Sequence, residues 1–292
     1  MKHLLLAIAA TAMLAGCSSE EENPNFCSYP TDNTVRVTAN VNNMIRATYT
    51  TASIAEFGMC ICKASDDSYN YPNMKMAKNG SEWKPATEML WQNSTQAVDI
   101  IAYAPYDANL TNANISNYEL EVSTNQTQTD DKSDFLIYKR TGFVPKNDLV
   151  NGIVPVTFDH ALSQLNLTIT FDSKFSPMTS NPITSVKIRG TKVKGTCDFT
   201  LDQPAVTAKD GSAADVTAQV SDFTAAASSS ENAVATYSCI LIPQTVSKSD
   251  FSIDIEATFY GNNKTYHWFP SQAITLENGK DYQLSMTLEK DN

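Results

Sequence analysis

The chain has 292 residues, of which 42% are hydrophobic and 18% charged, and its formal net charge is −11. Domains usually run about 100–200 residues, so this length predicts two domains, with one large β-domain as the alternative. The strong negative charge argues against nucleic acid and against anionic lipid as partners, because both carry charge of the same sign.

The first residues are typical of a bacterial export signal. The apolar run at 4–14 is too short to span a bilayer, and no later run approaches the roughly 18 apolar residues of a membrane helix. The last residue of the run and the three after it resemble the bacterial lipobox, in which a Cys thiol is lipidated and the chain is cut before it: Leu14, Ala15, Gly16 and Cys17. An ordinary secretory signal with a chance cysteine is the alternative.

This pattern divides the N-terminal part into a signal and a tether. Residues 1–16 are predicted to be a lipoprotein signal peptide, and the acidic and polar residues 17–33 a tether. A lipid on Cys17 would anchor the chain in the outer membrane at the cell surface, because several acyl chains give stable anchoring where one is marginal.

The rest of the chain is predicted to be β-structure. Alternation in TVRVTANV, residues 34–41, places one set of small apolar side chains on a single face: Val35, Val37, Ala39 and Val41. The last strand, 282–290, has the same period, with another set on one face: Tyr282, Leu284, Met286 and Leu288. Between them, strands are predicted at 57–64, at 96–106, at 134–140, twice within 154–171 with a bend near His160–Ser163, in a hairpin or meander over 185–201, and in a hairpin of 251–260 with 264–270.

Short alternating strands separated by turn residues favour an all-β fold of sandwich type over an α/β fold. A polar cluster near residue 150 predicts a boundary there. We therefore expect two tandem β-sandwich domains, mostly antiparallel, at 34–150 and 151–292.

Residues that could carry chemistry are few. Downstream of the signal the histidines are His160 and His267, and no nucleophile, phosphate-loop or metal-binding motif is present, so we expect no catalytic residues, no metal site and no cofactor. Trp83, Trp91 and Trp268 are candidates for a carbohydrate platform, although aromatic residues of β-proteins more often belong to the core.

The cysteines after Cys17 have no zinc spacing and are odd in number, so at least one is unpaired within the chain. They are Cys27, Cys60, Cys62, Cys197 and Cys239. Small buried hydrophobic residues are the expected role for most of them, and the sequence leaves their disulfide state open.

Several segments together resemble the fimbrillin family, the subunits of type V pili of Bacteroides-group bacteria. The phrase FDHALSQL within VTFDHALSQLNLTI (156–169) is the most specific of them. The others are IRATYT (45–50), LWQNSTQAVDIIAYAPY (90–106), DFLIYKR (134–140) and YHWFPSQAITLENGKDYQLSMTL (266–288).

The resemblance implies a fold and an assembly route. Fimbrillins look like two transthyretin-like β-sandwich domains that are exported as lipoproteins. In polymerising members an Arg-specific protease cuts near the start of the first domain, the first strand leaves, and a strand of another subunit fills the groove. Here the cut would fall between Arg46 and Ala47, and the donor would be the strand at 282–290.

Four donor side chains would contribute roughly 6–12 kcal/mol on burial, at about 1.5–3 kcal/mol each, before ordering costs. The expected function is thus a stalk or simple tip subunit of an adhesive pilus, whose partners are other subunits, the protease and a host or glycan receptor. An uncut lipoprotein that serves as a pilus anchor is one alternative. A monomeric surface lipoprotein that binds glycan or a host ligand is the second, and an enzyme is the third.

Overall fold

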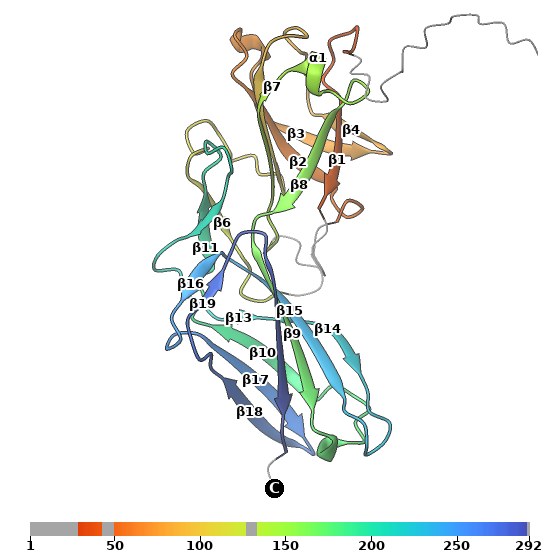
Figure 1. The fold of residues 1–292 in the computed structure, drawn as a ribbon, viewed down its shortest axis with the longest axis vertical. Coiled ribbons are helices and arrows are strands. Elements are labelled where there is room, and N and C mark those ends of the chain that lie inside the picture. The colour runs from red at the N-terminus through yellow and green to blue at the C-terminus, as the bar shows by residue number, and fades with distance from the viewer. Residues whose placement is uncertain (1–28, 43–49, 127–132, 291–292) are drawn as a thin grey trace, which may run out of the picture.

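The described chain is almost entirely β-structure and forms two bodies along one long axis (Figure 1). The computed structural model describes residues 29–42, 50–126 and 133–290. The all-β class predicted from the alternating patterns is confirmed. Within these ranges no helix has the length and apolar character needed to cross a membrane.

The first body is a closed barrel with the strand order β1-β4-β3-β2-β5-β7-β8. Its strands are β1 (Val37–Val41), β2 (Glu56–Cys62), β3 (Tyr71–Asn79), β4 (Glu82–Pro85), β5 (Val98–Ala104), β7 (Leu136–Phe143) and β8 (Val154–His160). The sandwich expected for this half is not confirmed, because β1 pairs with β4 on one side and with β8 on the other and so closes the sheet. Closure removes the free edges that an open sheet would present.

The strand β5 is buried on both faces, which explains its unbroken apolar sequence VDIIAYA. Ile100 and Ala102 face the barrel core, where Phe57 packs edge-on against the rings of Trp83 and Phe158. The other face of β5 carries Ile101 and Tyr103, which belong to the core of the second body. β5 therefore connects the two cores.

The second body is built mainly from two four-stranded sheets, in the orders β13-β10-β17-β18 and β14-β15-β9-β20. Smaller sheets, β12-β11-β6 and β16-β19, lie beside them. The strands are β6 (Tyr118–Glu121), β9 (Ser163–Phe171), β10 (Ile183–Arg189), β11 (Lys194–Cys197), β12 (Val206–Ala208), β13 (Val216–Thr217), β14 (Gln219–Thr224), β15 (Val234–Leu241), β16 (Gln244–Val246), β17 (Ser252–Phe259), β18 (Asn262–Trp268), β19 (Ile274–Leu276) and β20 (Asp281–Leu288). Short helical turns, η1 (Asp67–Tyr69), α1 (Pro145–Asp148) and η3 (Ser173–Phe175), complete the described elements.

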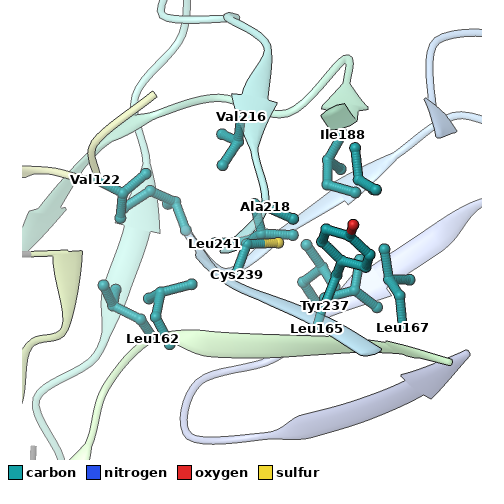
Figure 2. Close-up of a cluster of buried hydrophobic side chains, with 14 of the residues drawn as sticks. Val122, Leu162, Leu165, Leu167, Ile188, Val216, Ala218, Tyr237, Cys239 and Leu241 are labelled. Atoms are coloured by element: carbon teal, nitrogen blue, oxygen red, sulfur yellow. The ribbon is translucent and has the colours of Figure 1, made fainter. Parts of the chain in front are cut away.

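Residues that precede position 150 take part in the second body. β6 pairs with β11, and Figure 2 shows Val122 among the core side chains that include Leu241 and Cys239. The amide of Gln126 imitates a strand partner: its Nε2 donates to the carbonyl of Ile240 at 2.6 Å, and Ile240 N–H donates back at 2.7 Å. The domain boundary near residue 150 stays a prediction, and these contacts cross it.

Two local expectations are corrected. The segment 185–201 does not form a hairpin, because β10 and β11 belong to different sheets and the chain changes sheet after Gly190. The tether does not extend to residue 33, because Asn33 O accepts from Trp91 N–H at 2.7 Å and Tyr29 packs against the barrel core. The bend at His160–Ser163 is confirmed, since β8 ends at His160 and β9 begins at Ser163.

We predict that Gly58→Ala destabilises the fold by about 2 kcal/mol, since overpacking typically costs about 1–3 kcal/mol. A Cβ atom at residue 58 would lie 2.2 Å from Cε1 of Tyr103. That ring has no room to move, because it is fully buried and its hydroxyl donates to Asn73 Oδ1 at 2.6 Å. Urea unfolding measures the change.

Gly80→Ala is the matched control, because residue 80 has a positive φ of 65° and no heavy atom within 4 Å of the added carbon. It should cost about 1–2 kcal/mol through backbone strain alone. If Gly58→Ala unfolds at the same urea concentration as Gly80→Ala or at a higher one, the contact with Tyr103 is relieved by a small shift.

Candidate functional site

The first strand, β1, is buried on one face and forms part of the barrel wall. Four alternating side chains, three on β1 and Val35 just before it, are between 2% and 7% exposed and belong to the barrel core: Val35, Val37, Ala39 and Val41. Its pairing with β8 is parallel, from Val37 opposite Val154 to Val41 opposite Phe158. Val154, Val156 and Phe158 are themselves fully buried, so β1 and β8 present their apolar sides to the same core.

The join between β1 and β4 is much weaker than the join with β8. β1 meets β4 only at Val37 opposite Trp83, whereas its register with β8 runs along the whole strand. Residues before β1 add backbone hydrogen bonds to the segment after β4, such as Val35 N–H to Met89 O at 2.8 Å. The barrel therefore has a seam at β1, where the sheet is closed through a single residue pair with β4.

The predicted lipidation and cleavage residues lie outside the described residues. This applies to Leu14, Ala15, Gly16 and Cys17, and also to Arg46 and Ala47. The described chain stops at Asn42, directly after β1, and resumes at Thr50. Both flanking ends are tied to the barrel, since Val41 N–H donates to Thr51 Oγ1 at 2.9 Å and Asn42 N–H to Phe158 O at 2.8 Å.

The other arginines of the chain are held in ion pairs, two of them within strands and one just before β1. The sequence contains four arginines, Arg36, Arg46, Arg140 and Arg189. Arg36 pairs with Asp32 at 2.5 Å and holds the pKa of that carboxyl well below its usual range, with help from Thr34 N–H. Arg140 in β7 pairs with Asp148 at 3.2 Å, and Arg189 at the end of β10 pairs with Asp254 at 2.5 Å.

The last strand, β20, lies at the edge of its sheet in the described fold. It pairs in parallel with β9, from Asp281 opposite Gln164 to Leu288 opposite Phe171. Leu288 is buried, and Tyr282, Leu284 and Met286 are half-buried against the second core, whereas Gln283, Ser285 and Thr287 are exposed. The alternation predicted for this strand therefore matches one covered and one open face.

The first and last strands stand in the same relation to one continuous segment. β8 and β9 are separated only by Ala161 and Leu162, and they run through the barrel and the second body in turn (Figure 1). β1 pairs in parallel with β8, and β20 pairs in parallel with β9. Sequence patterns did not indicate either partner, because alternation identifies the faces of a strand and says nothing of its neighbour.

The three tryptophans do not form one platform. Trp83 and Trp91 are 8% and 2% exposed inside the barrel, where Trp91 stacks on Phe143. Trp268 is half-buried on β18 in the second body, edge-on to Phe251. No shared surface joins them, so this set does not make the carbohydrate platform considered from the sequence.

The histidines are separate structural partners of carboxylates. His160 Nδ1, at the end of β8, lies 3.0 Å from the buried carboxylate of Asp134. His267 Nδ1 lies 2.8 Å from Asp254 on the outer face of β17 and β18. Within the described ranges no group of His, Cys, Asp and Glu is arranged to hold a metal ion.

A polar cleft of about 790 Å³ separates the barrel from the second body. Lys139 of β7 lines it and crosses to the other body, where its Nζ donates to three successive carbonyl groups, those of Phe199, Thr200 and Leu201, at 2.7–3.0 Å. Beside it, Tyr103, Tyr118, Phe135 and Phe199 form an aromatic cluster. Lys139 and this cluster hold the two bodies together. No pattern in the sequence indicated that role.

The cysteines inside the described ranges are free thiols, and Cys27 lies outside those ranges. Cys60, Cys197 and Cys239 are buried, and burial raises the pKa of each of these thiols to about 12. A neutral buried thiol is a poor nucleophile and packs as a small hydrophobic group, so these three are structural.

The family model described as fimbrillin-like matches residues 34–292. The chain belongs to the fimbrillin-like family. Its members are structural subunits of cell-surface fimbriae and not enzymes, so this fimbrillin-like chain is a non-enzymatic fimbrial subunit.

Solved structures show the same fold at low identity. A candidate cell adhesion protein of Bacteroides uniformis is 18% identical, with a TM-score of 0.61 over 89% of this chain and 94% of that one. A second candidate cell adhesion protein, of Bacteroides ovatus, is 18% identical, with a TM-score of 0.59 over 90% and 93%. The tip fimbrial protein Mfa3 of Porphyromonas gingivalis, in a C-terminally truncated form, is 8% identical, with a TM-score of 0.50 over 88% and 96%. No curated protein matches the chain.

We predict that the free energy of unfolding falls as pH rises above about 9. The three buried thiols have raised pKa values in the folded chain, near 12 against 9.0, so their stabilising contribution is complete below pH 9 and is lost between pH 9 and 12. Each thiol adds up to about 1.4 kcal/mol per pH unit to that slope. Urea unfolding from pH 8 to 11 measures it.

Cys239→Ala tests whether the buried thiols cause this pH dependence. The comparison uses the slope of the free energy of unfolding against pH, so a change in absolute stability does not affect it. The variant should lose stability less steeply above pH 9 than the parent chain. Identical slopes would show that other groups, such as the buried tyrosines, cause the pH dependence.

Proposed function

We propose that this fimbrillin-like chain is a stalk or simple tip subunit of an adhesive pilus that is exported as a lipoprotein and assembled by strand exchange. In this proposal a lipid on Cys17 holds the chain at the outer membrane until an Arg-specific protease cuts after Arg46. The cut separates β1 and its tether from the rest of the barrel. The single observation that carries the proposal is the seam at β1, a strand with one buried apolar face that is joined to β4 at one position.

Loss of β1 would leave an apolar groove in the barrel. Val154, Val156 and Phe158 on β8 would lose the side chains that lie opposite or beside them, and the backbone edge of β8 would lose its parallel partner. Unpaired strand edges next to exposed apolar side chains are templates for an added strand. The groove therefore favours an incoming strand with apolar side chains at every second residue.

The strand β20 of another subunit has the pattern that this groove needs. Its apolar face offers four positions with period two, as residues 35–41 do, and it already pairs in parallel with the strand that follows β8. The side chains of β20 are larger than those of β1, so a donated β20 would place more apolar area in the groove, in exchange for its burial against its own second core.

The arginine environments support a single cut. A protease needs an extended, accessible segment, and Arg140 and Arg189 lie in strands whose backbone is engaged in the sheets. Arg36 lies next to β1, and its carbonyl accepts from Val154 N–H at 2.8 Å. Arg46, between Asn42 and Thr50, is the remaining arginine of the chain.

We predict that Arg46→Ala blocks maturation. Mass spectrometry of the subunit from intact cells should find a mature N-terminus at Ala47 in the parent chain, and a lipid-bearing N-terminus at Cys17 in the variant. Arg140→Ala is the control and should mature as the parent does. Normal maturation and assembly of Arg46→Ala would overturn the cleavage step, and lipid on Cys17 in every parent copy would favour an anchor or a monomeric binder.

We predict that Leu284→Thr with Met286→Thr abolishes polymers that resist SDS. Threonine keeps β propensity but removes apolar volume from the face that would fill the groove, at a cost of about 1.5–3 kcal/mol for each side chain. Gel electrophoresis of unheated samples measures the polymers, and thermal unfolding checks that the free subunit still folds.

Ser285→Thr is the matched control on the exposed face of the same strand and should leave the polymer ladder intact. An unchanged ladder in the folded double variant would exclude β20 as the donor strand.

A further inference from the structure

The C-terminal end of β1 points toward the second body (Figure 1) and is held there by a side-chain hydrogen bond. Asn42, directly after β1, donates from Nδ2 to Oδ1 of Asp159 at 2.5 Å. In the parallel register Val41 lies opposite Phe158, so Asn42 and Asp159 are the next pair along the same two chain segments. A side chain that donates suits this position, because an ionised carboxylate only accepts hydrogen bonds.

Asn42 and Asp159 stand at the polar cleft between the two bodies. Both line it, together with Asp202 of the second body, and all three are exposed. Among the described residues Lys139 is the only lysine or arginine that lines the cleft, and its three N–H donors are all used by carbonyl groups at 2.7–3.0 Å. The lining therefore carries two carboxylates against one engaged ammonium group, which favours a cation or a neutral donor in the place of Asn42.

The apolar spacing fixes the register in which β20 of a second copy would enter the groove left by β1. Residues 35–41 present four buried side chains with period two, and β20 presents four over residues 282–288. For a donated strand that runs in the direction of β1, all four positions are filled only when Leu284 replaces Val37 and Leu288 replaces Val41. This register leaves no apolar position of the groove empty.

Charge disfavours the two neighbouring registers. A shift by two residues in one direction would place Lys290 where Val41 is buried, and a shift in the other direction would place Lys280 where Val35 is buried. A shift by one residue would turn the apolar face of β20 outward. Because a buried ammonium group without a partner is costly, the register with Leu288 in the place of Val41 is favoured.

In the favoured register one side chain that follows β20 meets a charge of the same sign. The outward-facing Gln283, Ser285 and Thr287 are uncharged, but Glu289 takes the place of Asn42, next to Asp159. Like charges directly opposite each other on neighbouring strands are destabilising. The apolar face of β20 thus fits the groove, whereas the residue that follows it does not.

We propose that Asp159 selects the partner of this groove. It favours a donor strand whose four alternating apolar side chains are followed by a lysine, an arginine or a neutral hydrogen-bond donor at the position of Asn42. It disfavours a second copy of this chain, so the groove accepts a different subunit in preference to an identical one. Selection of this kind rests on the strand exchange of the proposed function and adds the kind of partner to it.

Peptide displacement on the purified chain, cut with an Arg-specific protease, tests the inference. The probe is the peptide DYQLSMTLEK, residues 281–290, with a fluorophore at its N-terminus and an amidated C-terminus, and fluorescence anisotropy measures its affinity. We expect the Glu289→Gln peptide to bind about threefold and the Glu289→Lys peptide about tenfold more tightly than the parent peptide, with differences that shrink as salt rises. The uncut variant Arg46→Ala should bind none of them, because β1 fills its groove.

Ser285→Lys is the matched control peptide. It changes the net charge by the same amount as Glu289→Gln, at an outward position that lies opposite Pro155 in the same register, and it should bind as the parent peptide does. In the chain, Asp159→Asn should remove the preference for the Glu289→Gln peptide. Asp222→Asn, at an exposed aspartate of β14 outside the cleft, should keep that preference.

The outcomes distinguish partner selection from strand exchange. Selection by Asp159 is wrong, and strand exchange stands, if the parent peptide binds as tightly as Glu289→Lys, if Ser285→Lys gains as much as Glu289→Gln, or if the Asp159→Asn chain keeps the preference. Both are wrong if no peptide displaces β1 from the cut chain, or if the peptides bind the uncut chain equally well.

Discussion

The structure depends on one continuous β segment, Val154 to Phe171, that passes from the barrel into the second body. In the barrel its first part, β8, supports the N-terminal strand β1, and in the second body its later part, β9, supports the C-terminal strand β20. Both supported strands are parallel to it. Because a single segment holds both, the strand that leaves in our proposal and the strand that is donated are placed along one line of the molecule (Figure 1).

The segment keeps β1 and β20 in a fixed relation only if the two bodies stay together. Several interactions between the bodies hold them in place. Lys139 of the barrel donates to three carbonyl groups of the other body, and the ring of Tyr103 on β5 packs with Phe199 beyond β11. Gln126 completes the connection through its paired hydrogen bonds with Ile240. A charged group with three acceptors and a satisfied buried amide specify one arrangement more strictly than apolar packing does.

The sequence by itself determined the faces of the strands. Period-2 alternation identified the buried side of β1 and of β20, the bend between β8 and β9 was predicted from the sequence at His160–Ser163, and the fimbrillin resemblance led to the correct family. Tertiary structure alone decided the neighbours: closure of the barrel at Val37 opposite Trp83, the parallel partners of β1 and β20, the separation of β10 from β11, and the distribution of the tryptophans. The physical reason is that alternation reports only which side of a strand is covered. The partner of a strand depends on contacts between residues that are distant in the chain, and short-range patterns contain no information about them.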